Sequence, residues 1–265
     1  KKFMEHKKLK RVEDYNKVLP IVEIYTAVQS EGSRAGYPTV VIRTTGCTHR
    51  CYFGEGGWCD SFYTSIHPEK GKYTFQSIID MYKANPHIKE MMLTGGSPTM
   101  IPHLVNELTH FAHENNIFIT IETEGSHFLP TDYPINLLSI SPKFSNSVPV
   151  LGVETPQGAI TDQKMIDRHN KLRLNYTAMS NMMSYHSDYH IKPVWDGVDE
   201  ESLQEILDFI KIMDVPEDKV WFMPAGDSRE ALFKSYPILF DWVRDNGYRM
   251  TWRPHIIAFE DQREV

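Results

Sequence analysis

Short apolar segments rich in β-branched residues alternate along this chain with longer segments of helical period. Such alternation is typical of a parallel α/β sheet or barrel, in which strands are followed by covering helices. We therefore expect the α/β fold class. The expected strands are 21–28, 39–46, 90–96, 117–125, 137–143, 189–195, 220–226 and 250–257, and the expected helices are 74–85, 102–116, 161–185, 201–214 and 228–247.

Length and composition set the scale of the fold. With 265 residues, 41% of them hydrophobic, the chain can bury one core of barrel size. We expect residues 1–20 to form a mobile basic arm and residues 21–265 to form a single domain. The formal charge of −7, from 35 acidic and 28 basic residues, argues against a general nucleic-acid binder. We see neither a membrane span nor a secretory signal, and we expect a cytoplasmic protein.

Glycine and polar residues gather where six of the expected strands end. In barrels and open parallel sheets, ligands bind at the carboxyl ends of the strands. Residues of this kind at several successive ends therefore predict one shared site along one rim. The six ends are Thr44–Cys47, Thr94–Ser97, Glu122–Gly125, Ser139–Lys143, Met223–Gly226 and Arg253–His255.

All three cysteines, Cys47, Cys51 and Cys59, lie on the loop after the second expected strand. An odd number of cysteines on one loop is no disulfide framework, whereas free thiolates serve as metal ligands in a reducing compartment. Three thiolates can bind three irons of a 4Fe-4S cluster and leave the fourth iron open for chemistry. The alternative is a structural zinc site that adds His49, although its one-residue spacing from both neighbours is awkward for tetrahedral closure.

This layout, a strand followed by C-x-x-x-C with a third cysteine and then by a GG turn, resembles the radical S-adenosylmethionine superfamily. More narrowly, residues 21–265 resemble the 7-carboxy-7-deazaguanine synthase family. The resemblance implies a shortened, partly open (β/α) barrel, a homodimer, and catalysis that needs a 4Fe-4S cluster, S-adenosyl-L-methionine and Mg²⁺. The matching landmarks are 29-QSEG-32, Arg43, 58-WCD-60 with Ser61, 94-TGGSP-98, 122-ETEGS-126, 139-SISPK-143, 223-MPAG-226 and 254-PH-255.

The resemblance also implies a reaction and a role for each matching residue. The reaction is ring contraction of 6-carboxy-5,6,7,8-tetrahydropterin to 7-carboxy-7-deazaguanine with loss of ammonia, in queuosine-type biosynthesis, with electrons from a flavodoxin-like or other reductant. The implied residues are Cys47, Cys51 and Cys59 for the cluster; Gly95, Gly96, Glu122, Ser141 and Lys143 for S-adenosylmethionine; Gln29, Glu31, Arg43, Ser97 and His255 for the pterin; and Ser61, with Asp60 as a weaker candidate, for Mg²⁺.

The chain departs from the family pattern at Ser30, Ser97, Glu124 and Ser61, where glycine, glutamate, asparagine and threonine are usual. Two segments are expected insertions. Residues 53–57 lengthen the cysteine loop, because removing them leaves the usual Cys-Tyr-Trp-Cys-Asp, and residues 144–159 form an irregular surface insertion.

Two other functions remain open at this point. A radical activase that acts on a partner protein fits the three thiols and the size equally well. A non-enzymatic zinc-binding module would bind zinc and would not bind S-adenosylmethionine.

Overall fold

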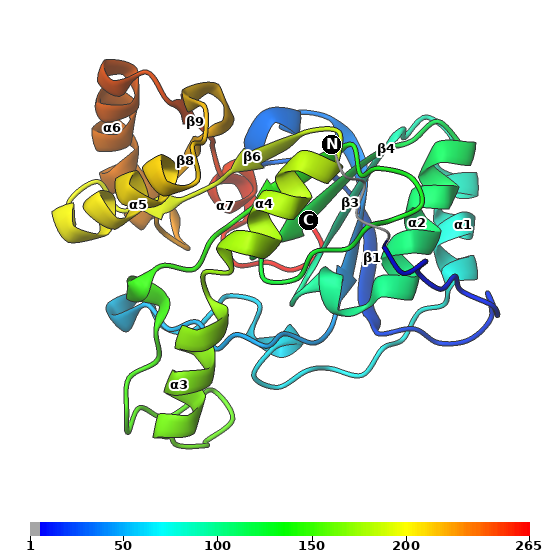
Figure 1. The fold of residues 1–265 in the computed structure, drawn as a ribbon, viewed down its shortest axis with the longest axis horizontal. Coiled ribbons are helices and arrows are strands. Elements are labelled where there is room, and N and C mark those ends of the chain that lie inside the picture. Colours follow the sequence, from blue (N-terminus) through cyan, green and yellow to red (C-terminus); the bar gives the residue numbers. More distant parts are fainter. Residues whose placement is uncertain (1–5) are drawn as a thin grey trace.

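The centre of the fold is a six-stranded sheet in which all neighbouring strands except the first two run parallel (Figure 1). The computed structural model describes residues 6–265. In spatial order the strands are β1 (Ile21–Val28), β2 (Pro38–Thr44), β3 (Glu90–Gly95), β4 (Phe118–Thr123), β5 (Leu137–Ile140) and β6 (Tyr189–Ile191).

A smaller sheet continues from the last strand of the larger one. A parallel bridge between Ile191 and Val220 connects the two. Within the described part of the chain the strands do not close into a ring, and the expected α/β class with an open barrel is confirmed. The smaller sheet contains β7 (Val194–Trp195), β8 (Trp221–Pro224) and β9 (Arg249–Met250), in that order and all parallel.

Helices cover the sheets and supply the rest of the core. Figure 1 shows α1 and α2 together at one side of the large sheet. Phe75 and Ile78 of α1 and Leu104 and Leu108 of α2 are fully buried, which makes this side of the sheet the centre of the apolar core. The helices are α1 (Phe75–Ala84), α2 (Pro102–Glu114), α3 (Gln163–Leu172), α4 (Tyr176–Tyr185), α5 (Glu200–Ile212), α6 (Arg229–Asn246) and α7 (Pro254–Phe259).

The orientation of β1 corrects the expectation of an all-parallel sheet. Thr26 pairs with Val40 and Val28 with Pro38, so β1 and β2 form an antiparallel pair. Only residues 29–37 connect the two strands. A parallel crossover needs a dozen or more residues, so this connection can only reverse the chain.

Three expected elements are divided. The expected helix 161–185 breaks between α3 and α4, where Asn175 caps the new helix by accepting a hydrogen bond from the Ala178 amide. The expected strand 250–257 ends at Met250, and Pro254 begins α7. The expected strand 189–195 is interrupted at Lys192 and Pro193, between β6 and β7.

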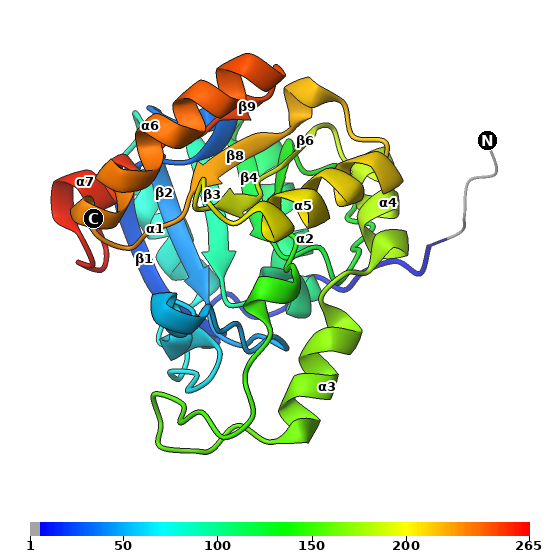
Figure 2. The same ribbon diagram turned by 90° about the vertical axis from the view of Figure 1, so that its left-hand side faces the viewer.

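The irregular segment 144–159 is exposed over much of its length and leads into α3. Figures 1 and 2 show this loop and α3 projecting together from the body of the molecule. Val150 and Leu151 are exposed, whereas Ser147 and Thr155 are buried. The segment therefore has an outer surface and an inner face, and the inner face contacts the cysteine loop.

The N-terminal arm is not free of the domain. Glu107 of α2 is 1% exposed and accepts hydrogen bonds from the Arg11 guanidinium at 2.8 and 2.9 Å, from the Val12 amide and from the Tyr15 hydroxyl. The Tyr15 ring also packs on Phe75. The expected mobile arm is thus anchored along its described part, and residues 1–5 lie outside the described residues.

Within residues 6–265, no helix is both long enough and apolar enough to cross a membrane.

The anchored arm should make stability depend on pH through Glu107. Burial raises the pKa of this carboxyl, but the hydrogen bonds from Arg11 and Tyr15 outweigh burial and leave the pKa below its ordinary value. The stability it contributes is therefore present above about pH 4.3, the ordinary glutamate value, and is lost as the pH falls through the lower folded value.

We expect Glu107→Gln to lower the free energy of unfolding by about 2 kcal/mol at pH 7, because hydrogen bonds to a charged group are lost. The difference from the unmodified protein should shrink as the pH falls below about 4. Urea denaturation at several pH values measures both. Glu114→Gln, an exposed position on the same helix, is the control, and an equal effect of the two variants would contradict the anchoring role.

Candidate functional site

A cavity of about 290 Å³ opens where the strand ends meet, and it contains nearly every expected site residue. All six strand ends contribute to its walls, so the shared site predicted from them is found. Ser97 is the exception, because it is fully buried behind the wall. The expected residues that line the cavity are Gln29, Glu31, Arg43, Cys47, Cys51, Cys59, Asp60, Ser61, Gly95, Gly96, Glu122, Ser141, Lys143 and His255.

The cysteine loop closes on itself despite its length. The Cys59 amide donates to the Cys51 carbonyl at 3.0 Å, so these two residues are neighbours although seven residues separate them. Above this contact, Tyr52 and Trp58 form an antiparallel bridge and their rings lie 4.8 Å apart. Residues 53–57 therefore bulge outward, as expected of an insertion.

The three thiols line one cavity and suit the three open positions of a cluster. Burial raises the pKa of Cys47 to about 12 and that of Cys59 to about 11, and it also raises the pKa of Cys51. Among residues 6–265, no three His, Cys, Asp or Glu side chains are arranged as ligands of a single ion. A 4Fe-4S cluster does not require this, because each thiolate binds a different iron.

His49 is held away from the role of a zinc ligand by its own hydrogen bonds. Its ring is 2% exposed, with Nδ1 3.2 Å from the Thr48 hydroxyl and Nε2 3.3 Å from the Ser126 hydroxyl. Burial lowers the pKa of His49 to about 3, so the ring is neutral. Both nitrogens are occupied, which disfavours the zinc alternative.

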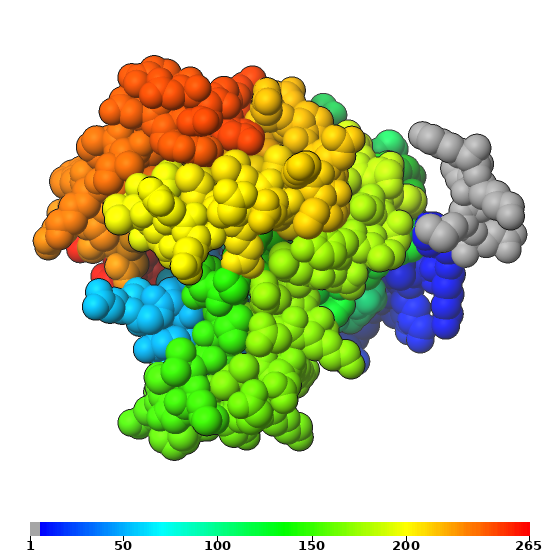
Figure 3. Space-filling view, turned by 60° about the vertical axis from the view of Figure 1, so that its left-hand side comes forward, coloured from blue at the N-terminus to red at the C-terminus, as the bar shows by residue number. Residues whose placement is uncertain are grey.

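A second buried histidine, His169 of α3, supports the loop from behind. Its Nδ1 accepts a hydrogen bond from the Arg50 amide at 3.0 Å, and its Nε2 donates to the Ser147 hydroxyl at 2.9 Å. The Tyr52 amide donates to the Ser147 carbonyl, and the Trp58 indole donates to the Glu154 carbonyl. In Figure 3 the light-blue cysteine loop lies against this green segment.

The glycine turn after β3 packs against the start of the cysteine loop. A Cβ on Gly96 would lie 2.2 Å from the Gly46 carbonyl oxygen, and one on Gly95 would lie 2.3 Å from the Thr44 hydroxyl. The Ser97 amide also donates to the Gly46 carbonyl at 2.7 Å. Close approach of two backbones thus requires these glycines, whereas the sequence suggested only an approach to a ligand.

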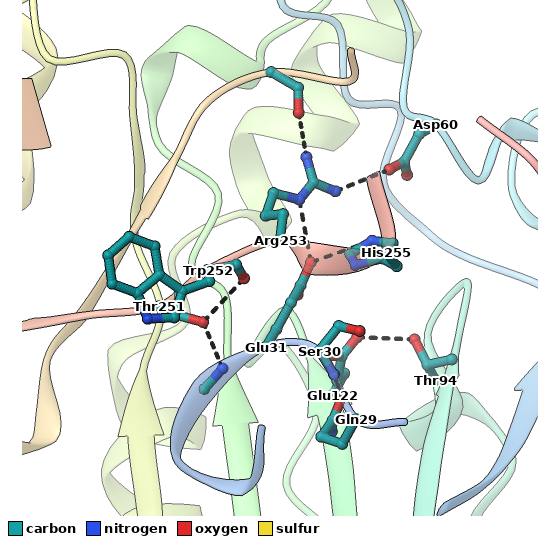
Figure 4. Close-up of polar contacts among 12 residues, drawn as sticks. Gln29, Ser30, Glu31, Asp60, Thr94, Glu122, Thr251, Trp252, Arg253 and His255 are labelled. Atoms are coloured by element: carbon teal, nitrogen blue, oxygen red, sulfur yellow. Dashed lines mark hydrogen bonds and ion pairs between the residues drawn. The ribbon is translucent and has the colours of Figure 1, made fainter. Parts of the chain in front are cut away.

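A buried lysine contacts one residue predicted to bind the pterin and one predicted to bind S-adenosylmethionine. Lys192 donates to Glu31 at 2.5 Å and to Glu122 at 3.2 Å, and its side chain is 4% exposed. Burial lowers the pKa of Lys192, but the two carboxylates outweigh it and raise the pKa above its ordinary value. The Thr94 hydroxyl donates to the other oxygen of Glu122 (Figure 4). The ammonium is therefore charged and shared between the two carboxylates.

A second cation, Arg253, binds the other carboxylate oxygen of Glu31 (Figure 4). Its Nε donates to Glu31 at 3.2 Å, and its Nη2 lies 3.7 Å from the Asp60 carboxylate. The Nε2 of His255 lies 3.9 Å from the same glutamate. Burial raises the pKa of Glu31, but Lys192 and then Arg253 outweigh it and hold the pKa well below its usual range.

Arg43 has a protein partner of its own. Its Nε donates to Glu23 at 2.7 Å, and its Nη1 lies 3.3 Å from both the Ser61 hydroxyl and the Gly95 carbonyl. Glu23 is 1% exposed and also binds Arg263. The charge on an apolar strand is thus neutralised, and Arg43 connects the Ser61 turn to the glycine turn.

Lys192, Arg253 and Glu124 also line the cavity; Lys192 was missed in the sequence, whereas Arg253 and Glu124 stood among the strand ends without an assigned role. The rule that found the other residues could have found Lys192, because a lysine and a proline end an apolar strand there. Arg253 stood beside the recognised proline and histidine. Glu124 was noted within a strand end and as a departure from the family pattern, and spacing does not reveal its contact with Ser97.

The chain is similar to known proteins over most of its length. No family model matches the chain. A 7-carboxy-7-deazaguanine synthase of Rhodopirellula baltica is 30% identical over 245 residues, covering 92% of this chain and 88% of that protein. One of Halobacterium salinarum is 29% identical over 250 residues, covering 93% of each. The crystal structure of QueE from Escherichia coli matches with a TM-score of 0.53 at 17% identity, over 88% of this chain and 92% of that one, which shows a shared fold.

The closed bulge predicts that residues 53–57 can be removed without loss of the thiol arrangement. Deletion joins Tyr52 to Trp58, and shortening a flexible loop changes closure entropy by only about 0.6 kcal/mol per halving. We expect the deletion variant to bind the same amounts of iron and sulfide as the unmodified protein after anaerobic reconstitution. A folded variant that takes up no iron would make the bulge part of the metal site.

The contact of His169 with the loop backbone predicts a role in retaining a cluster. His169→Ala leaves the Arg50 amide without its acceptor, at a cost of about 1–3 kcal/mol, whereas the asparagine in His169→Asn carries an acceptor close to the position of Nδ1. We expect faster release of iron to a chelator from the alanine variant and near-normal release from the asparagine variant. Equal rates for both variants and the unmodified protein would refute this role.

Proposed function

The chain belongs to the 7-carboxy-7-deazaguanine synthase family, and from this premise we propose that its cavity contracts 6-carboxy-5,6,7,8-tetrahydropterin to 7-carboxy-7-deazaguanine with release of ammonia. One observation carries the proposal. The cavity places three cysteines beside a set of paired charges that can hold a small polar ring. A cavity of about 290 Å³ lined by paired charges suits a small polar molecule, which favours this reaction over the activase alternative.

Cys47, Cys51 and Cys59 would hold the 4Fe-4S cluster through three of its irons. When bound, a reduced cluster with S-adenosylmethionine would supply radical chemistry directed at C6 of the pterin. Because the buried thiols have raised pKa values, cluster assembly would release protons from them. The protein's own contribution is to bind, orient and exclude water.

Residues directly after β5, on β4 and in the glycine turn would bind S-adenosylmethionine. Lys143 lines the cavity near the three cysteines and would pair with the carboxylate of the cofactor, as Ser141 would by hydrogen bonding. Glu122 is held by Lys192 and Thr94, so its orientation is set before the cofactor binds. The backbone of Gly95 and Gly96 completes this wall.

The pterin would bind between Glu31 and the arginines. Glu31 is ionised and can accept hydrogen bonds from the amino and ring N–H groups of the pterin, with Gln29 beside it. His255 has a pKa lowered by burial, and its buried Nδ1 has no partner among the described residues, so that atom is available to the substrate. Arg43 and Arg253 flank the Asp60 and Ser61 turn, where the substrate carboxylate would bind.

The same turn would hold Mg²⁺. Ser61 donates to Asp60 at 3.2 Å, and two oxygens on an exposed turn suit a cation that keeps several water ligands. A magnesium ion there would polarise the substrate carboxylate during rearrangement. Ser97 would act behind the wall and not in direct contact with the pterin, because it does not line the cavity.

We further infer a homodimer, a flavodoxin-like or other reductant and a reducing, cytoplasmic setting. Free thiols suited to a cluster favour such a setting. Exposed Phe233, Phe240 and Trp252 form an apolar surface on and beside α6, with the rings of Phe240 and Trp252 6.5 Å apart. Such a surface is suited to contact with another protein chain.

The proposed reaction is tested with the reconstituted, reduced protein, S-adenosylmethionine, Mg²⁺ and 6-carboxy-5,6,7,8-tetrahydropterin. We expect 7-carboxy-7-deazaguanine and ammonia by mass spectrometry and enzymatic assay. Cys51→Ala should abolish turnover and cluster binding, because the chain has no spare cysteine. A protein with a full cluster that cleaves S-adenosylmethionine and leaves the pterin unchanged would exclude this substrate.

A further inference from the structure

Glu124 is a buried carboxylate on the cavity wall next to the cysteines. It lies in the loop after β4 and is 6% exposed. It lines the same cavity as Cys47, Cys51 and Cys59. It is therefore on the side of the cavity where the cluster and S-adenosylmethionine would meet.

Within the described part of the chain, the carboxylate of Glu124 has one hydrogen-bond partner. Its Oε1 accepts a hydrogen bond from the Ser97 hydroxyl at 2.7 Å, and Ser97 is fully buried. Among residues 6–265, no cationic side chain lies within 4.0 Å of it. A carboxylate can accept about four hydrogen bonds, so one serine leaves most of this capacity unused.

The other carboxylates in and behind this wall are paired within the protein. Lys192 binds both Glu31 and Glu122, and Arg43 binds Glu23. Burying a carboxylate without a cation is costly, and structures normally avoid it. The carboxylate of Glu124 is therefore positioned to bind a cationic or strongly hydrogen-bond-donating group of a ligand.

We propose that Glu124, oriented by Ser97, binds the ammonium group of S-adenosylmethionine. This inference rests on the proposed function, which brings that molecule to this wall. The ammonium is its hydrogen-bonding cation, and charge-assisted hydrogen bonds are the stronger kind. The carboxylate of the same molecule would go to Lys143, so the two ends of its amino-acid portion would meet opposite charges.

The contact also explains two departures of the chain from its family. Where Ser97 and Glu124 stand, glutamate and asparagine are usual, and the structure shows that these two positions touch. The chain therefore keeps one carboxylate and one neutral hydrogen-bonding partner in the pair, with their places exchanged. Neither departure removes the acidic group from this part of the wall.

The test measures the affinity of the reconstituted, unreduced holoenzyme for S-adenosylmethionine and for an analogue in which hydrogen replaces the amino group. The unmodified protein should bind the analogue about 10 to 100 times more weakly, as expected for loss of a charge-assisted hydrogen bond. Glu124→Gln should weaken binding of S-adenosylmethionine by a similar factor and should bind the two ligands almost equally. Glu55→Gln, an exposed carboxylate on the cysteine loop, is the control for nonspecific charge effects.

The exchange of the acidic and the neutral residue between positions 97 and 124 allows binding of S-adenosylmethionine to be tested by rescue. Glu124→Asn alone should bind weakly, and the double variant Ser97→Glu with Glu124→Asn should recover both affinity and discrimination against the analogue. The iron and sulfide content of each variant shows whether the cluster still assembles. Should Glu124→Gln fail to fold, Glu124→Asp and Ser97→Ala, which displace the carboxylate without removing it, should show reduced discrimination.

The outcomes separate this inference from the proposed function. If Glu124→Gln discriminates against the analogue as strongly as the unmodified protein does, the assignment is wrong while the proposed function stands. The same conclusion follows if the double variant folds with a full cluster and stays as weak as Glu124→Asn. If the unmodified holoenzyme binds no S-adenosylmethionine, the proposed function and this assignment fail together.

Discussion

The close contact between the loops after β2 and β3 is the constraint on which the site depends. Gly96 packs so tightly on the Gly46 carbonyl that any side chain would collide with it, and the Ser97 amide hydrogen-bonds to the same oxygen. This contact fixes the first residues of the cysteine loop against the glycine turn. Backbone packing therefore holds the start of the cysteine loop against the glycine turn, and this contact does not depend on side chains elsewhere.

Charge pairing organises the interior around this contact. Lys192 neutralises Glu31 and Glu122 together, although one follows the antiparallel strand β1 and the other lies on β4. Removing water from two carboxylates is costly unless a cation is shared so closely. The same pairing leaves Glu31 ionised and oriented, as the proposed recognition of donor groups on a pterin requires. The same ion pairs thus stabilise the fold and orient the groups proposed to bind the substrate.

The segment from 144 to 173 adds a support for the cysteine loop that lies outside the barrel. It contacts the loop at Arg50, Tyr52 and Trp58, positions that flank two of the cysteines. A loop lengthened by five residues would otherwise gain freedom on both sides of Cys51 and Cys59. The segment 144–173 and the lengthened cysteine loop therefore lie together, and the contacts hold the residues on either side of the bulge.

Sequence periodicity alone determined the α/β class and most strand positions, and cysteine spacing with the glycine and polar strand ends determined where the site lies. These features are local, because the burial and backbone conformation at each position restrict which residue types can stand there. The antiparallel direction of β1 and the break at Asn175 follow from a short connection and a local helix cap that the periodicity did not reveal. The ion pairs of Lys192 and Arg253 and the contact between Ser97 and Glu124 were decided only by tertiary structure. Each depends on the distance between segments far apart in the chain, and spacing along a sequence does not contain that distance.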